Sequence, residues 1–242
     1  MTGAARSRLM GAAAMAAAGP FVLLASAMAL AQTQARAPSA TATPAELALP
    51  PPRVQGRLSL EGALSQRRSL RSFAATPLTA AEAGQLLWAA QGLSNAQGQR
   101  TAPSAGATYP LVLYFVAGRI DGMASGVYRY LPQGHRLVAM VTGDVRADIA
   151  AAALGQSWLR DAPALVVIAA QPARTAARYG ARAERYIAIE TGAAAQNLSL
   201  QAVALGLGST LVGAFDEAAL RRSVPLAEGE QPLVIVPVGR HR

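Results

Sequence analysis

The densest group of chemically useful side chains in this 242-residue sequence is Arg-Arg-Ser-Leu-Arg-Ser-Phe at residues 67–73. Guanidinium groups form bidentate, charge-assisted hydrogen bonds to phosphate, so these arginines can neutralise a phosphate while the serine hydroxyls contact polar groups beside it. Arginines are also common at helix C-termini, where they complement the helix dipole. For this segment taken alone, both interpretations stay open.

Two further segments are built mainly from small residues. Residues 103–110 are Pro-Ser-Ala-Gly-Ala-Thr-Tyr-Pro, and residues 206–216 are Gly-Leu-Gly-Ser-Thr-Leu-Val-Gly-Ala-Phe-Asp. Short side chains let backbone amides approach a flat ligand closely. An ordinary surface turn explains either segment by itself, so only their combination with residues 67–73 points to a binding site.

Composition excludes several kinds of chemistry. The sequence has no cysteine and no lysine, and its only histidines are His135 and His241. Disulfides, zinc–thiolate clusters and lysine Schiff bases are therefore excluded. A serine hydrolase using Ser104 lacks both the Gly-x-Ser-x-Gly elbow and a suitable histidine. The net charge is +9, but the arginines are scattered and do not alternate with aromatics, so we expect no nucleic-acid partner.

The N-terminal segment predicts export. Residues 1–31 have two arginines, then an apolar stretch that ends in Ala-Leu-Ala, which is typical of a signal peptide. An uncleaved membrane anchor is the alternative, and it would be the only contact with the membrane. Residues 32–58 are rich in alanine and proline and are interpreted as a tether. Residues 59–242 are then a folded domain, which we expect to be exported to the periplasm.

The elements that must position these segments follow from capping and periodicity. Ser59 predicts a helix start, and Thr79 with Glu82 forms a capping box for a second helix that ends at Gly92. Further helices are predicted at 144–158, 175–205 and 217–222, and strands at 111–117, 126–130, 136–140, 164–169, 209–212 and 233–238. The pattern predicts an α+β fold with a small, mainly antiparallel sheet wrapped by helices around a long central helix.

Taken together, the segments resemble the nitroreductase superfamily, and within it the SagB-type branch of azoline-oxidising dehydrogenases. The resemblance rests on residues 67–73 and 103–110, with Gly-Val-Tyr-Arg-Tyr at 126–130 between them and the later segments. It continues through residues 190–198 and 204–208 to Val-Pro-Val-Gly at 236–239. The motifs occur in the family's order and cover the chain from about residue 59 to its end.

The resemblance implies a homodimer with two FMN molecules in the subunit interface. It assigns the FMN phosphate and ribityl chain to Arg67, Arg68, Ser69 and Arg71. It places Pro103, Ser104, Ala105 and Gly106 beside the isoalloxazine ring, from the other subunit. Backbone contacts to the ring would come from Leu211, Val212 and Gly213, and Arg240 and Arg242 would complete the phosphate site.

The implied reaction is hydride transfer through flavin N5 to or from a small organic substrate, with NAD(P)H as a possible electron donor. Azoline-oxidising members add a Lys-Tyr pair, whereas this chain has Arg178 and Tyr179 at the matching place. An arginine is a poor base at neutral pH, so Tyr179 is the single catalytic candidate. The alternative function is a cell-envelope binding protein that keeps the fold without redox turnover.

Overall fold

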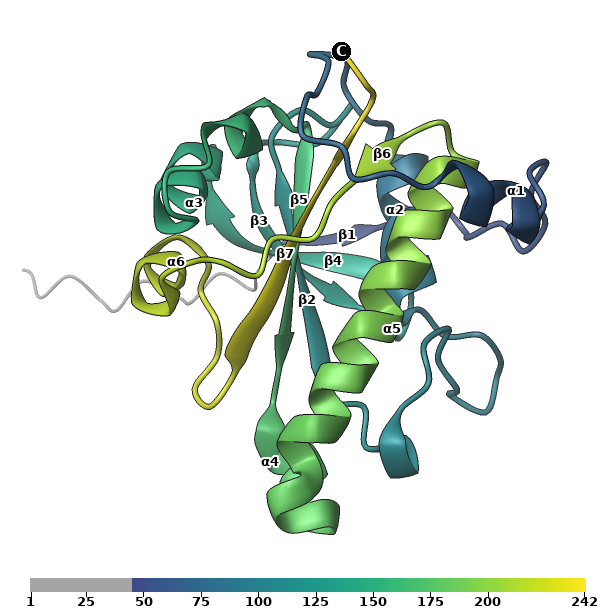
Figure 1. Ribbon diagram of the computed structural model, residues 1–242, viewed down its shortest axis with the longest axis vertical. Helices are drawn as coiled ribbons and strands as arrows, with labels where there is room; N and C mark the ends of the chain where they lie inside the picture. The colour runs from purple at the N-terminus through teal and green to yellow at the C-terminus, as the bar shows by residue number, and fades with distance from the viewer. Residues whose placement is uncertain (1–44) are drawn as a thin grey trace, which may run out of the picture. The chain divides into compact units, whose positions relative to one another are not determined.

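The computed structural model describes residues 45–242 and contains a seven-stranded sheet with strand order β1-β4-β3-β2-β5-β7-β6 (Figure 1). All neighbouring strands pair antiparallel. The strands are β1 (Glu46–Ala48), β2 (Leu111–Ala117), β3 (Gly126–Leu131), β4 (Arg136–Thr142), β5 (Ala164–Ala170), β6 (Gly208–Ser209) and β7 (Gln231–Gly239). The predicted signal peptide and residues 32–44 of the predicted tether lie outside the described residues.

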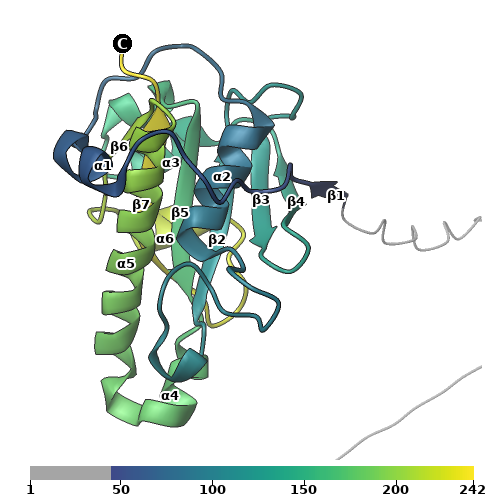
Figure 2. The ribbon, with the colours of Figure 1, turned by 90° about the vertical axis from the view of Figure 1, so that its right-hand side faces the viewer.

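Helices cover both faces of the sheet. They are α1 (Leu60–Gln66), α2 (Ala80–Gln91), α3 (Arg146–Ala152), α4 (Pro172–Tyr179), α5 (Ala183–Ala204) and α6 (Glu217–Ser223), with short 3-10 turns at Ala105–Ala107, Ser157–Asp161 and Gly180–Arg182. α2 and α5 lie on one face, and α3 and α6 on the other (Figures 1 and 2). The α+β prediction with an antiparallel sheet wrapped by helices is confirmed.

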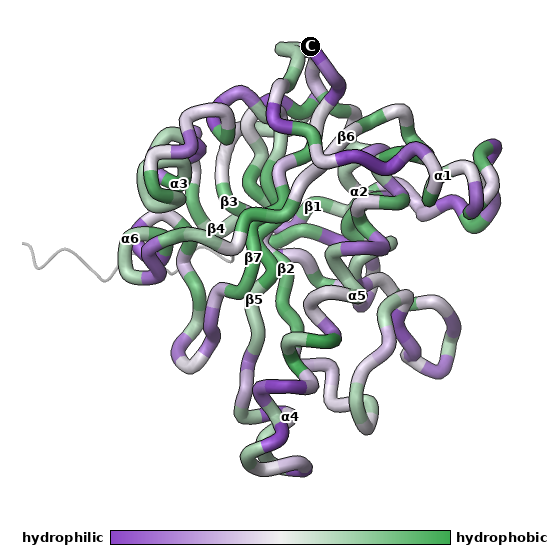
Figure 3. Tube along the Cα trace, viewed as in Figure 1, coloured by the Kyte–Doolittle hydropathy of each residue, from purple (hydrophilic) through white to green (hydrophobic). Residues whose placement is uncertain are grey.

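Strand β2 shows why the sheet is buried on both faces. Leu111, Leu113 and Phe115 belong to the core shared with α2 and α5. Val112 and Tyr114 alternate with them and belong to the core under α3 and α6. Because successive side chains of a strand point to opposite faces, a strand between two helical layers must be apolar at every position. The hydrophobic strands accordingly run through the middle of the molecule in Figure 3.

The predicted helix starts are confirmed. Ser59 Oγ accepts the Gly62 N–H at 3.1 Å, which caps α1. At α2, Thr79 Oγ1 accepts the Glu82 N–H at 3.1 Å and Glu82 Oε2 accepts the Thr79 N–H at 2.8 Å. Both halves of the capping box are therefore formed, and α2 ends at Gly92 as expected.

Two predicted helices are wrong in extent. The helix expected over 175–205 is two helices, because α4 ends at Tyr179 and Gly180 takes φ 52° and ψ −130°. That backbone conformation is open to glycine and strained for other residues, so the chain turns there before α5 begins at Ala183. The helix expected over 144–158 ends at Ala152, because Leu154 and Gly155 adopt positive φ.

The described part of the predicted tether packs on the folded unit. β1 pairs with β4, with Leu47 opposite Leu137, and Leu49 is buried in the core. The Arg53 backbone then bonds to the Gln85 side chain of α2 through both its N–H and its carbonyl, at 2.8 and 3.0 Å. Within residues 45–242 there is no helix long and apolar enough to cross a membrane.

Candidate functional site

Residues 67–73 lie against the segment that follows α5. The Leu70 N–H donates to the Ser209 carbonyl at 3.0 Å, and Ser69 pairs with Ser209 in a parallel bridge. Leu70 packs over Gly208 so closely that a Cβ there would lie 2.5 Å from Leu70 Cδ2. Glycine at 208 therefore permits the contact that joins the first predicted cofactor segment to the third.

The last residues of the chain join the same cluster. Phe73 pairs with His241, and the Ala74 N–H donates to the Arg240 carbonyl at 2.9 Å. Val212 pairs with Ile235 of β7 and is buried, whereas Leu211 and Gly213 beside it are exposed. The structure thus brings together residues 67–73, 208–213 and 240–242. These segments contain the residues that the resemblance assigns to the FMN phosphate and to backbone contacts with the ring, namely Arg67, Arg68, Ser69, Arg71, Leu211, Val212, Gly213, Arg240 and Arg242.

The basic residues in this cluster have different partners. Arg67 is half-buried, Arg68 and Arg71 are exposed, and none of the three forms an ion pair within residues 45–242. Arg240 donates to Glu82 Oε1 at 2.6 Å and so ties the C-terminal strand to the α2 capping box. Arg242 lies 3.5 Å from Asp161 at the surface. Within this cluster, the three arginines of residues 67–71 are therefore without a carboxylate partner in the described residues and can bind an added anion.

Residues 103–106 form a tight turn held by α5. Ser104 Oγ accepts the Tyr109 N–H at 2.9 Å, and the Ala105 N–H donates to Glu190 Oε1 at 2.7 Å. Gly106 adopts φ 57°, which other residues rarely do. Glu190 is buried, and its Oε2 has no hydrogen-bond partner within the described residues. Burial raises the pKa of the Glu190 carboxyl, and the hydrogen bond from Ala105 opposes that shift.

Tyr179 lies against this turn. A Cβ on Gly106 would be 2.6 Å from Tyr179 Oη, and Arg178 Nη1 donates to the Gly106 carbonyl at 3.1 Å. The Tyr179 ring packs edge-on against Tyr186, with 4.9 Å between ring centroids. Tyr179, the catalytic candidate, and residues 103–106 are thus brought together within one chain, and the Tyr179 hydroxyl lies against Gly106.

The two groups lie far apart in the chain's fold. Glu190, in the first half of α5, contacts the turn at residues 103–106. Ser209, which contacts residues 69 and 70, follows shortly after α5 ends at Ala204. At about 1.5 Å per residue, the helix separates them by roughly 20 Å. Figures 1 and 2 show the 3-10 turn beside α4 and the C-terminus at opposite ends of α5. A single ligand ring cannot contact both groups of one chain.

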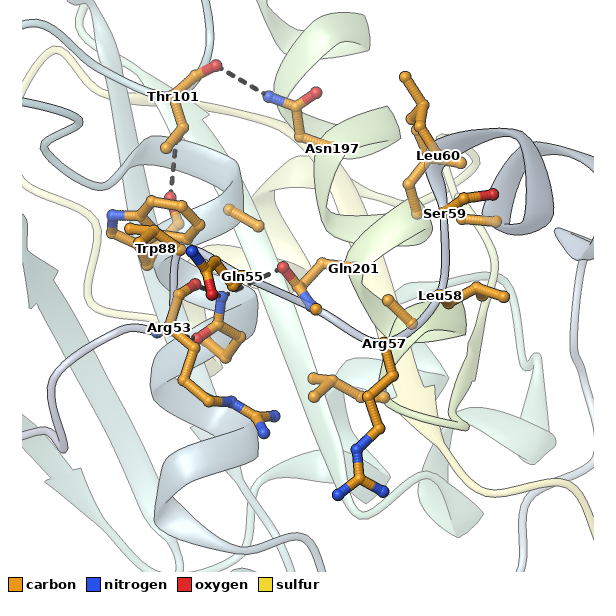
Figure 4. Close-up of a pocket in the computed structure, with 18 of the residues that line it drawn as sticks. Arg53, Gln55, Arg57, Leu58, Ser59, Leu60, Trp88, Thr101, Asn197 and Gln201 are labelled. Atoms are coloured by element: carbon orange, nitrogen blue, oxygen red, sulfur yellow. Dashed lines mark hydrogen bonds between the residues drawn. The ribbon is translucent and has the colours of Figure 1, made fainter.

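A large pocket lies elsewhere, between residues 53–60, α2 and α5 (Figure 4). This α2–α5 pocket has a volume of about 970 Å³, and none of the predicted cofactor residues lines it. Among its lining residues, Gln85 Nε2 donates to Gln201 Oε1 at 3.2 Å, and Asn197 Nδ2 donates to the Thr101 carbonyl at 3.1 Å. Sequence reasoning missed this pocket because its lining comes from separate segments that share no motif.

The sequence also showed no sign that Glu190 is buried and holds the turn at residues 103–106. Glu190 lies in residues 190–198, which resemble the family, but its hydrogen bond with Ala105 joins positions 85 residues apart. Within the described residues there is no group of three or more His, Asp or Glu side chains that could hold a metal ion. The described residues therefore offer guanidinium groups for an anion beside the end of α5 and the Tyr179 hydroxyl beside the turn at residues 103–106.

Comparison with known proteins gives a consistent picture. The model of the nitroreductase family matches residues 64–240. A protein of Methanocaldococcus jannaschii assigned as a nitroreductase is 42% identical over 183 residues, covering 76% of this chain and 91% of that protein. A crystal structure of a nitroreductase-like protein from Ralstonia eutropha superposes with a TM-score of 0.71 at 30% identity, covering 83% of this chain and 94% of the other. The NADPH:FMN oxidoreductase of Vibrio harveyi shares the fold, with a TM-score of 0.55 at 19% identity over 75% of this chain and 68% of that one.

Proposed function

The chain belongs to the nitroreductase family, and from this premise we propose that it is an FMN-dependent oxidoreductase that works as a homodimer on a small organic substrate. The observation that carries the proposal is the gathering of residues 67–73, 208–213 and 240–242 at one end of the sheet. These segments are separate in the sequence, and they supply cations, hydroxyls and exposed backbone in one place.

The donor set fits FMN. Arg67, Arg68 and Arg71 carry guanidinium groups without an acidic partner in the described residues, which suits a phosphate dianion. Ser69 is exposed beside them and can bind the ribityl hydroxyls. Leu211 and Gly213 expose a face next to this group, and a Cβ on Gly213 would meet nothing within 4 Å. That open surface suits the approach of a flat ring.

The distance along α5 supports the homodimer. Residues 103–106 and Tyr179 lie roughly 20 Å from the arginine segment of their own subunit, by the helix rise. In the proposed dimer, each site takes the arginine segment from one protomer and residues 103–106 from its partner. A two-fold axis makes the two sites equivalent, since an isologous interface presents the same surfaces twice.

The residues of this chain then have distinct tasks. FMN, when bound, supplies hydride acceptance and donation at N5. Arg67, Arg68 and Arg71 hold the phosphate, while the turn at residues 103–106 covers the ring. Glu190 holds that turn by accepting the Ala105 N–H. Tyr179, fixed against Gly106, is the hydroxyl group placed to exchange a proton with a bound substrate.

The assignment to the SagB-type branch is a finer proposal. It is supported by the sequence of residues 103–110 and by Tyr179 lying beside that segment. Arg178 departs from the branch's Lys-Tyr pair, and here its guanidinium donates to the Gly106 carbonyl. Arg178 therefore holds the turn and does not replace the lysine as a base, which favours a substrate other than a peptide azoline.

The proposed place of action is outside the cytoplasmic membrane. This proposal rests on residues 1–31, which resemble a signal peptide. At that place, an electron donor other than NAD(P)H is as consistent with the proposed function as NAD(P)H itself. Fractionation of cells that produce the full chain, with N-terminal sequencing of the product, tests this point. Recovery of the intact chain from the cytoplasm alone would contradict export.

The function itself is tested by an absorbance spectrum of the purified protein before and after incubation with FMN, recorded across a size-exclusion peak. We expect flavin bands that co-elute with a dimer, and bleaching of those bands by a reductant. A colourless protein that binds no FMN would refute the cofactor assignment and favour an envelope binding protein. Flavin bound to a monomer would refute the shared site but would leave the cofactor assignment standing.

Subunit complementation gives a sharper test of the shared site. Arg68→Glu removes the phosphate contact, and Gly106→Val distorts the turn because its Cβ would meet Tyr179. Each variant alone should lose FMN. Refolding the two together should restore flavin to about a quarter of the sites, since half of the dimers are mixed and each holds one intact site. No recovery from the mixture would show that both segments serve the same protomer's site.

A further inference from the structure

A second, smaller hollow carries an unusual charge. This arginine pocket lies between the loop before Pro103, the start of β2, the end of β3 and α4, with a volume of about 110 Å³. Its polar lining includes Gln91, Arg100, Arg129, Tyr130 and Arg174, and no acidic residue lines it. Pockets for whole small molecules start at roughly 300 Å³, so this one has room for a single compact group.

Arg100 is the least satisfied of these cations. Its Nη1 lies 3.4 Å from both the backbone carbonyl and Oε1 of Gln91, at the long limit of a hydrogen bond. Its Nε is buried and has no hydrogen-bond partner within residues 45–242. The guanidinium stacks over the Tyr109 ring, 5.0 Å from the centroid. Arg100 therefore keeps donor capacity that the described protein does not use.

Arg174 adds a second positive charge close by. It donates to the Tyr109 carbonyl at 3.0 Å, and no carboxylate within the described residues pairs with it. Burial lowers the pKa of Arg100, the positive charge of Arg174 lowers it further, and the nearby tyrosines Tyr109 and Tyr130 act in the opposite direction. Arg100 is half-buried, and Arg174 is exposed at the mouth of the same pocket. Like charges held close together repel each other, and a bound anion relieves that repulsion.

The third arginine is already neutralised. Arg129 Nη2 lies 2.8 Å from Glu230 Oε1, and Glu230 lies outside the pocket lining. The pocket therefore carries two uncompensated positive charges, from Arg100 and Arg174. Forked guanidinium donors match the geometry of tetrahedral oxyanions.

We propose that the arginine pocket binds a phosphate or sulfate group, held by Arg100 and Arg174 with Gln91 beside it. This site is separate from the predicted flavin phosphate segment, since it lies on the turn side of the molecule. Both arginines contact Tyr109, whose N–H is bound by Ser104. A bound oxyanion would therefore also brace the turn at residues 103–109.

The test is calorimetric titration of FMN-saturated protein with inorganic phosphate at constant ionic strength, set against chloride. We expect Arg100→Gln and Arg174→Gln each to weaken phosphate binding at least about tenfold, the value of a charge-assisted hydrogen bond. Arg160→Gln is the matched control. Arg160 is exposed on the other face of the sheet, and its substitution by glutamine removes one positive charge, as the other two substitutions do. This control variant should bind phosphate like the unchanged protein.

Two further arms keep the result decisive. Gln91→Glu places a carboxylate beside Arg100, so it should abolish phosphate binding while raising the melting temperature, which a misfolded variant would not do. Titration with phenyl phosphate identifies the source of the anion. If the pocket binds a free anion, inorganic phosphate should bind as tightly as phenyl phosphate. If it binds the phosphate group of an organic ligand, phenyl phosphate should bind more tightly. Phosphate binding that is lost in Arg68→Gln and kept in Arg100→Gln would overturn the proposal, as would no binding by the unchanged protein.

Discussion

Glu230 is a buried carboxylate that joins two strands of the sheet to a turn. It is 2% exposed, its Oε1 accepts from Arg129 Nη2 at 2.8 Å, and its Oε2 accepts from the Tyr114 hydroxyl at 2.6 Å and from the Ala227 N–H at 3.1 Å. These bonds connect β3, β2 and the turn that precedes β7. Glu230→Ala removes all of them in one substitution.

The expected cost follows from what Glu230→Ala leaves behind. Removing one partner of a buried ion pair costs about 3–5 kcal/mol, because the remaining charge is left uncompensated. The Arg129 side chain retains 27% exposure, so we expect a value near the lower end, about 3 kcal/mol. Glu230→Gln keeps an acceptor for Arg129, and its amide can donate to the Tyr114 hydroxyl. It should cost only about 1–2 kcal/mol through the lost charge and the unpaired Ala227 N–H.

Urea denaturation followed by circular dichroism measures both values. The midpoint should fall in the order unchanged protein, Glu230→Gln, Glu230→Ala, with the slope of the transition unchanged. Glu228→Ala removes an exposed carboxylate two residues away and should change the free energy of unfolding by less than about 0.5 kcal/mol. If Glu230→Ala cost no more than Glu228→Ala, the reasoning from buried charge pairing would be refuted.

Three other predictions test the turn and the caps. Burial raises the pKa of Glu190, so the folded state keeps this proton to higher pH than the unfolded state, whose carboxyl titrates near about 4.3. Stability should then fall as pH rises from the unfolded to the folded pKa. Glu190→Gln should remove that fall in urea denaturation across mildly acidic to neutral pH; an unchanged pH profile would contradict the shift. Gly106→Ala sets a Cβ at positive φ, 2.6 Å from Tyr179 Oη, and should lower flavin retention after dialysis; full retention would contradict the role given to the turn. Thr79→Ala removes the cap of α2 and should cost about 1 kcal/mol in the same denaturation assay, with no loss showing that the capping box is dispensable.

Features that depend on neighbours in sequence were predicted correctly. Ser59 and Thr79 cap helices because a cap is made by bonds three residues away, and the residue types alone indicate them. The uninterrupted apolar run of β2 indicates burial on both faces, which the structure confirms. The family resemblance likewise follows from short local motifs, and the match to residues 64–240 confirms it at the level of the nitroreductase family.

Local signals did not predict the break between α4 and α5. Gly180 stands in a stretch that otherwise favours helix, yet it takes φ 52° where α4 ends. β1 was also missed, because three residues beside a proline-rich segment form a strand only when β4 offers its edge. Propensity is a weak guide wherever tertiary contacts decide the conformation.

The sequence alone determined which residue types this protein has for binding a phosphate and a ring, and in what order they occur. The tertiary structure decided which of them meet. It paired Ser69 with Ser209, and it set residues 103–106 beside Glu190 and Tyr179 at the other end of α5. It also placed Arg100 beside Arg174 around one hollow. Such contacts join residues far apart in the chain, and their free energy depends on burial and charge, which no local pattern records.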